Sequence, residues 1–221
     1  MGRAFFNLYL SRPEISLTQN LDLFIESSNH FLKHMRIFKT LFRILLLTVI
    51  LGTSYLAYTY LSLENLDGNL FLKEEMTEIK QFKNNINLQN KAISKAAIGW
   101  HLDHSLLTIN SIYETLKKSD TTAYNPSFNF PKVIMFSLGR IPRGRAKAPE
   151  KVQPKDSPSI KTIEEQIENA YKNLNRSDAL PQNSNFVHPY IGQLNRNEAK
   201  RFLKIHTLHH LKICRDILEA K

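Results

Sequence analysis

The sequence predicts an all-α protein, a four-helix bundle with a long crossover loop, preceded by an N-terminal transmembrane helix. Two observations carry this prediction. No charged residue occurs in the 20 residues from Ile44 to Leu63, and after residue 70 apolar residues recur at three- and four-residue steps in four separate segments. No run of alternating apolar and polar residues flanked by hairpin turns is found, which leaves helices as the expected elements.

Composition excludes several classes of protein. The chain has 221 residues, of which 42% are hydrophobic and 23% charged, so it is neither disordered nor collagen-like. Its single cysteine, Cys214, excludes a disulfide framework and any zinc or iron–sulfur site with several cysteine ligands. The net charge of +10 favours phosphate or membrane-surface partners only where the charge is clustered.

The uncharged segment has the length of a membrane span. A helix of this length rises about 30 Å, the thickness of the hydrocarbon core. Basic residues precede it (Lys33, Arg36, Lys39 and Arg43) and acidic residues prevail after it (Glu64, Asp67, Glu74, Glu75 and Glu78). The positive-inside rule therefore predicts a cytoplasmic tail and basic flank over 1–40, a transmembrane helix over 41–63, and an extracytoplasmic domain over 70–221.

Two other interpretations of this segment remain open. A cleaved signal peptide has the same order of charges, although the sequence from Tyr55 to Tyr60 is a poor match to a cleavage site with small residues. A core helix this apolar on all sides requires a large protein around it. Met35 followed by Arg36 is a conventional start for an anchor, so residues 1–34 are either a short cytoplasmic tail or lie before the true start.

The extracytoplasmic part divides into helices and one long connection. Residues 70–119 show helical periodicity with a break near 90–94, where Ser94 is an expected N-cap. Residues 120–158 lack the period and hold six of the nine prolines, which predicts a loop; its part 140–155 carries six basic residues against Glu150 alone. A third helix is expected over 159–175. Asn195, with Glu198 three residues on, resembles the capping box of a fourth.

Histidines interrupt two of the apolar stripes. His206 and His210 are four residues apart and share a helix face, and His101 lies in the stripe of another helix. Neutral imidazoles are costly to bury unless each finds a partner, and one divalent metal would satisfy all three while leaving a coordination position open. His104 is a rival third ligand, whereas His209 is expected at the edge of the stripe. The competing interpretation is that these are hydrogen-bonded core histidines.

Two stretches resemble a known family. Asn185–Asn195, which contains His188-Pro189 and Gly192, and Phe202–Leu211, which contains the three C-terminal histidines, resemble the DinB/YfiT-like superfamily, in a branch where HPxxG precedes a helix with HxxHH. Ser94–Asp103 resembles that superfamily's second-helix segment. The resemblance covers residues 70–221 and implies a four-helix bundle with zinc or nickel held by His101, His206 and His210. It also implies a metal-dependent hydrolase or thiol transferase, although the anchor and the long basic loop depart from the small cytosolic members.

The function expected is therefore that of a membrane-anchored, metal-dependent enzyme. Ser105, Asp103 and Tyr190 are candidates for supporting the ligands, and Arg143 or Arg145 for meeting an anionic substrate. Cys214 is expected to pack as an apolar residue and not as a fourth ligand. The alternative is a non-catalytic anchored bundle that acts as a binding or structural protein. Expected partners are the lipid bilayer and an unidentified small molecule; a homodimer is left open, and no nucleic acid is expected.

Overall fold

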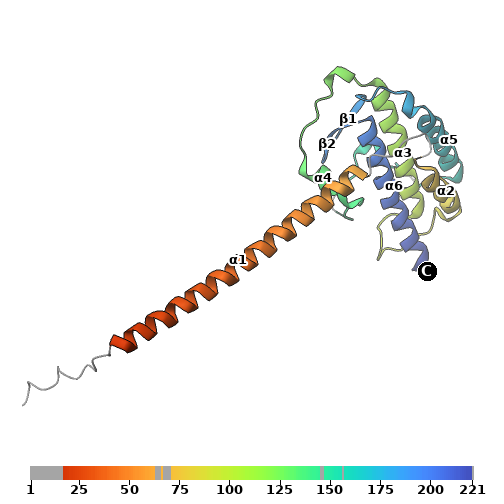
Figure 1. The fold of residues 1–221 in the computed structure, drawn as a ribbon. Coiled ribbons are helices and arrows are strands. Elements are labelled where there is room, and N and C mark those ends of the chain that lie inside the picture. The colour runs from red at the N-terminus through yellow and green to blue at the C-terminus, as the bar shows by residue number, and fades with distance from the viewer. Residues whose placement is uncertain (1–16, 63–65, 67–70, 145–146, 156, 221) are drawn as a thin grey trace, which may run out of the picture. The chain divides into compact units, whose positions relative to one another are not determined.

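The computed structural model describes residues 17–62, 66, 71–144, 147–155 and 157–220. These residues are predominantly helical, as predicted, with one long apolar helix near the N-terminus (Figure 1). The chain divides into two compact units, with the boundary between Ser54 and Tyr55.

Helix α1 (Leu17–Ser62) has 46 residues and contains the expected span as far as residue 62, while Leu63 lies outside the described residues. Its segment Phe24–Thr59 is long and apolar enough to cross a membrane, and large apolar side chains such as Leu47 and Leu51 are exposed along it. The helix begins well before residue 41, because the basic flank between Lys33 and Arg43 has no helix-breaking residue and continues the same helix. The first 16 residues of the expected tail lie outside the described residues.

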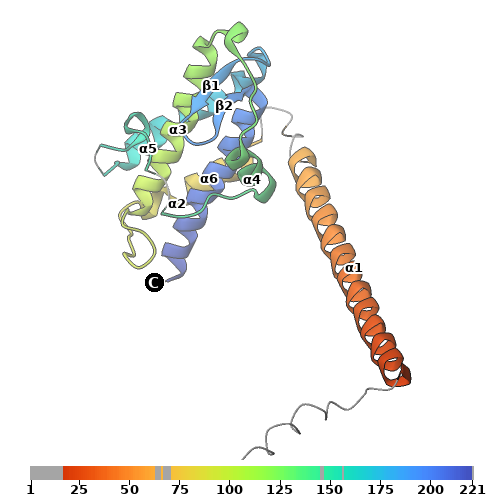
Figure 2. The ribbon, with the colours of Figure 1, turned by 90° about the vertical axis from the view of Figure 1, so that its left-hand side faces the viewer.

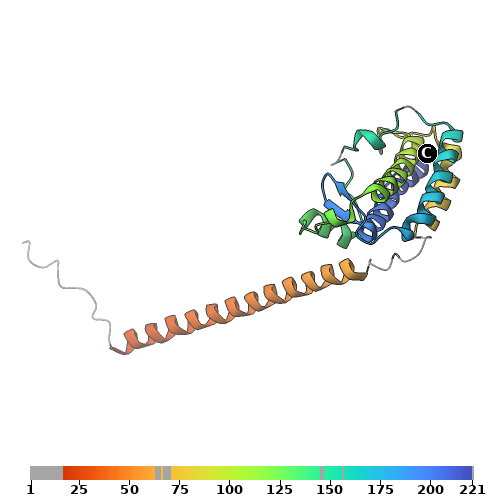
Figure 3. The same cartoon turned by 90° about the horizontal axis from the view of Figure 1, so that it is seen from above.

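Four helices of the second unit bury their apolar stripes against one another: α2 (Lys73–Phe82), α3 (Ile98–Lys118), α5 (Ile160–Arg176) and α6 (Arg196–Glu219). Helix α3 packs against both α5 and α6, and α2 packs against α6. Seen from above, α3 and α6 run side by side (Figure 3). Fully buried side chains recur at helical spacing along α3, as in Ile98, Leu102, Leu106 and Ile109.

The helix starts were predicted with mixed success. The capping box of α6 is confirmed, because the Asn195 side chain accepts from the backbone of Glu198 and the Glu198 carboxylate accepts from the backbone of Asn195. Ser94 is not an N-cap, which corrects the prediction. Helix α3 begins at Ile98, and the Ser94 hydroxyl instead accepts from the backbone N–H of Ala96 in the preceding turn.

Two further elements lie where the sequence predicted only loop. Strands β1 (Asn185–His188) and β2 (Gly192–Asn195) form an antiparallel hairpin, and Gly192 adopts a positive φ of 74° that favours glycine. Helix α4 (Phe130–Leu138) lies within the proline-rich connection, against α6 (Figure 2). Pro131 does not prevent this helix because it stands in the first turn, where a backbone N–H has no partner in any case.

Candidate metal centre

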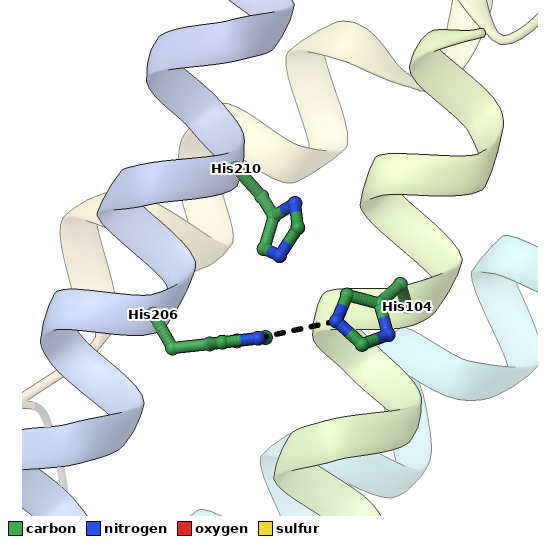
Figure 4. Close-up of side chains that lie close together, drawn as sticks. All are labelled: His104, His206 and His210. Carbon is green, nitrogen blue, oxygen red and sulfur yellow. Dashed lines mark hydrogen bonds between the residues drawn. The ribbon is translucent and has the colours of Figure 1, made fainter. Parts of the chain in front are cut away.

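Four imidazole rings converge between α3 and α6. His101 and His104 are three residues apart on α3, and His206 and His210 are four residues apart on α6, so each pair lies on one face of its helix. All four are buried, with at most 9% of any residue exposed. Figure 4 shows His206 and His210 projecting from α6 toward His104 on α3.

Three of these rings form a group of the size that holds one ion. One nitrogen from each of His104, His206 and His210 lies within 4.8 Å of the others. The Nε2 atoms of His104 and His206 are 3.2 Å apart. In a tetrahedral zinc site with Zn–N bonds of 2.0–2.1 Å, two ligand nitrogens are about 3.3 Å apart. The first pair thus has the required separation already, and the third ring needs to close by at most about 1.5 Å.

The tautomer of His104 is fixed by the backbone. Its Nδ1 lies 2.7 Å from the carbonyl oxygen of Val152, which lies within the basic part of the crossover loop. A carbonyl only accepts, so Nδ1 carries the proton and the lone pair of the neutral ring is on Nε2. That lone pair is directed at His206, whose own Nδ1 is buried without a hydrogen-bond partner. Because that lone pair can only accept, Nε2 of His206 carries a proton and donates to it. An ion bound at Nε2 of His206 would replace this hydrogen bond and move the proton to Nδ1.

His101 lies behind His210 in this arrangement. The Nδ1 atoms of the two rings are 3.0 Å apart, and the Nε2 of His101 is 2.9 Å from the Ser94 hydroxyl oxygen. Because Nδ1 of His210 is hydrogen-bonded to His101, Nε2 is the nitrogen of His210 that could bind an ion. If an ion binds Nε2 of His210, then its Nδ1–H donates to His101, and His101 in turn donates Nε2–H to the Ser94 hydroxyl oxygen. This chain of hydrogen bonds is the kind of support that orients metal-binding histidines.

Burial keeps the cluster uncharged. Desolvation is the largest cause of the lowered pKa of His101, which falls to about 4, with the neighbouring charge of His104 next. The pKa values of His206 and His210 lie well below the ordinary value for the same first reason. Burial also lowers the pKa of His104, against the opposing effect of its bond to Val152. Neutral imidazoles are the form that binds metals, so the site favours its ligand state at neutral pH.

The structure therefore brings together the three histidines that the sequence predicted as ligands (His101, His206 and His210) and His104, the alternative third ligand. The three histidines whose nitrogens lie close enough to bind one ion include His104. His101 is not one of them and contacts the group through its hydrogen bond with His210. His209 is half-buried beside His210, with ring centroids 5.0 Å apart, in agreement with a place at the edge of the stripe.

The residues expected to support the ligands lie in other settings. The Ser105 hydroxyl donates to the carbonyl of His101 within α3. Asp103 is buried, with its pKa raised by desolvation, and lines a separate pocket of about 620 Å³ with Leu107 and the segment 150–155. Tyr190 is exposed in the hairpin turn.

Two more expectations concern charge and the cysteine. Arg143 is ion-paired with Asp216 of α6 at 2.6 Å, which occupies the guanidinium that was expected to meet an anion, and Arg145 lies outside the described residues. Cys214 is fully buried, and burial raises the pKa of its thiol to about 12. It packs as an apolar residue, as predicted.

Two contacts of the histidine cluster, those with Val152 and Ser94, could not be predicted from the sequence. The Val152 carbonyl belongs to the backbone, so no residue type signals its role, and the Ser94 contact depends on how the turn before α3 folds. The ring of Trp100 stacks on His104 with centroids 4.9 Å apart, which helps to fix that imidazole.

Comparison with known proteins adds no further constraint. No family model matches the chain, no curated protein matches it, and no solved structure matches it. The functional assignment therefore rests on the fold and the histidine cluster.

Proposed function

We propose that this chain is a membrane-anchored metalloenzyme of the DinB-like type, in which a four-helix bundle binds zinc or nickel through His104, His206 and His210. The single observation that carries the proposal is the meeting of three buried, neutral histidine nitrogens from two helices within 4.8 Å. The anchoring part rests on α1, whose segment Phe24–Thr59 has spanning length and hydropathy. The charge asymmetry around it favours a cytoplasmic N-terminus and a bundle on the other side.

The residues of the chain have distinct tasks in this proposal. Val152 holds His104 in the tautomer whose Nε2 lone pair faces His206, and His101 accepts Nδ1–H from His210 when His210 binds the ion through Nε2. When bound, a divalent ion would lower the pKa of a coordinated water or thiol, or polarise a substrate carbonyl. Three protein ligands leave a position for that group, which fits a hydrolase or a thiol transferase.

The depth of the site favours a second candidate. Each of the three rings exposes less than a tenth of its surface, and a ligand set sealed in this way is also typical of a structural centre. The chain would then be a non-catalytic anchored bundle in which the histidines stabilise the fold.

The first experiment measures metal content. The full chain, expressed with its anchor and purified in detergent, is expected to retain close to one zinc or nickel ion per chain by elemental analysis. His206→Ala combined with His210→Ala is expected to abolish retention. His209→Ala, on the same helix but outside the group, is the matched control and should keep the ion. A metal-free parent protein after growth with both metals would refute the proposal.

A second experiment separates the enzyme from the structural candidate. The protein is loaded with Co²⁺, whose visible spectrum reports coordination number and ligand exchange. An open position predicts a spectral change when azide or a small thiol is added. An unchanged spectrum at saturating concentrations of both would support the structural centre instead.

A further inference from the structure

Helix α4 buries Phe136 in the core and also exposes apolar side chains on its other side. Its one charged residue, Lys132, is buried and ion-paired with Glu198 of α6 at 2.9 Å. The apolar side chains at positions 130, 134 and 138 form a stripe along the opposite face, at the spacing of one helical side. Phe130 and Leu138 are 64% and 45% exposed, respectively. An outward stripe of this kind is typical of a surface that contacts a membrane or another protein.

The surroundings of α4 extend this outward face. Phe128, just before the helix, is 84% exposed. Just after it, the basic part of the crossover loop begins, and Arg140 and Lys147 are exposed there. Exposed aromatic and aliphatic side chains beside exposed cations are the composition of a segment that lies in the interface of an anionic membrane.

The contacts of α4 place it next to the end of the candidate span. The Ser137 hydroxyl donates to the backbone carbonyl of Leu56 at 3.1 Å, and Leu56 belongs to the segment Phe24–Thr59. The last turns of α1 from Tyr55 onward are part of the same compact unit as α4. The helix that carries the exposed apolar side chains thus contacts the C-terminal end of the segment that would cross the bilayer.

We infer that α4 and Phe128 form a second membrane contact, in which Phe128, Phe130 and Leu138 enter the lipid interface and the basic residues after the helix meet anionic headgroups. This inference rests on the anchoring by α1 proposed above. A surface helix fixed by Lys132 and Ser137 would hold the bundle against the bilayer. The occupant of the apolar face is the lipid surface and not a second protein.

The test uses single tryptophan probes in the full chain. Phe130→Trp is compared with Ile160→Trp, which adds the same probe to an exposed apolar position at the start of α5. Figure 2 shows α4 and α5 on opposite sides of α3 and α6, so the control lies away from the proposed contact. Each protein is reconstituted into vesicles of phosphatidylcholine and phosphatidylglycerol with brominated acyl chains, and the native Trp100 signal is subtracted with the parent protein.

The expected result is quenching at position 130 that is several-fold stronger than at position 160. Replacement of Leu138 by Ser together with Phe128→Ser should reduce the quenching at 130. Equal quenching at both positions would overturn the inference, as would an unquenched probe at 130 together with crosslinking between copies through this face. Failure of the anchor itself is distinguishable, because the parent chain would then be released from membranes by alkaline carbonate.

Discussion

Replacing His104 and His101 one at a time tests which of them is a ligand, because the two make opposite predictions. His104 contributes an Nε2 lone pair 3.2 Å from His206, so His104→Ala removes one of three ligands. His101 contacts the group only through Nδ1 of His210, so His101→Ala removes a support and leaves the ligand set intact. The resemblance to DinB-like proteins implies the reverse assignment, with His101 as the ligand from α3.

The magnitudes follow from these roles. Loss of a residue that orients a ligand weakens metal affinity by about 10–100-fold, or about 1.4–2.7 kcal/mol. His101→Ala is therefore expected to bind one ion more weakly. His104→Ala is expected to be empty at concentrations that saturate the parent. An ion at 100 times its dissociation constant adds about 2.7 kcal/mol of stability, which corresponds to a rise in Tm of about 5–10 °C for a unit of this size.

The assay is a zinc titration followed by competition with a chromophoric chelator, with Tm measured in parallel on the full chain in detergent. The parent and His101→Ala should both gain stability on zinc addition, and His104→Ala should not. His104→Gln, which retains a donor for the Val152 carbonyl, controls for loss of that hydrogen bond. If His101→Ala is empty while His104→Ala and His104→Gln bind zinc as the parent does, the assignment from the geometry is refuted.

Three other predictions concern stability. With a chelator present, the free energy of unfolding should fall as the pH drops from 6.5 toward 4, because histidines bind protons in the unfolded chain but stay neutral in the fold. The pKa of about 4 for His101 alone implies a loss of about 2 kcal/mol at pH 5, which the raised pKa of Asp103 partly offsets. Urea titrations that show no loss over this pH range would contradict the prediction. Gly99→Ala should destabilise by about 1–3 kcal/mol, since its Cβ would lie 3.0 Å from Ile86 atoms, whereas a gain in Tm would contradict that packing. Asn195→Ala should lower the free energy of unfolding by about 1 kcal/mol through loss of the α6 cap, and Asn195→Asp should restore most of it.

Periodicity predicted the helices of the second unit well because each buries a stripe that recurs over several turns. The same method failed for short elements. Helix α4 has nine residues and β1 and β2 have four each, which is too short for a period to stand out. The prediction also missed the hairpin because its turn is not one of the two-residue types that mark hairpins in a sequence.

The candidate site was predicted in its composition but not in its internal order. The spacing of His206 and His210 places both on one face of any α-helix, and their position in an apolar stripe directs that face inward. His101 and His104, three residues apart, also share a face, so sequence spacing cannot rank them. Which of them meets the α6 pair depends on the rotation and axial register of α3 against α6.

The sequence by itself determined the helical class, the apolar helix of membrane-spanning length and the four histidines, because each of these follows from residue type and spacing along one helix. Only the tertiary structure decided that His104 joins His206 and His210 while His101 lies behind them, and that α4 presents an apolar face outward. Both depend on contacts between segments far apart in the chain, such as those of Val152 with His104 and of Lys132 with Glu198. The pattern of neighbouring residues in the sequence carries no information on the energies of such contacts.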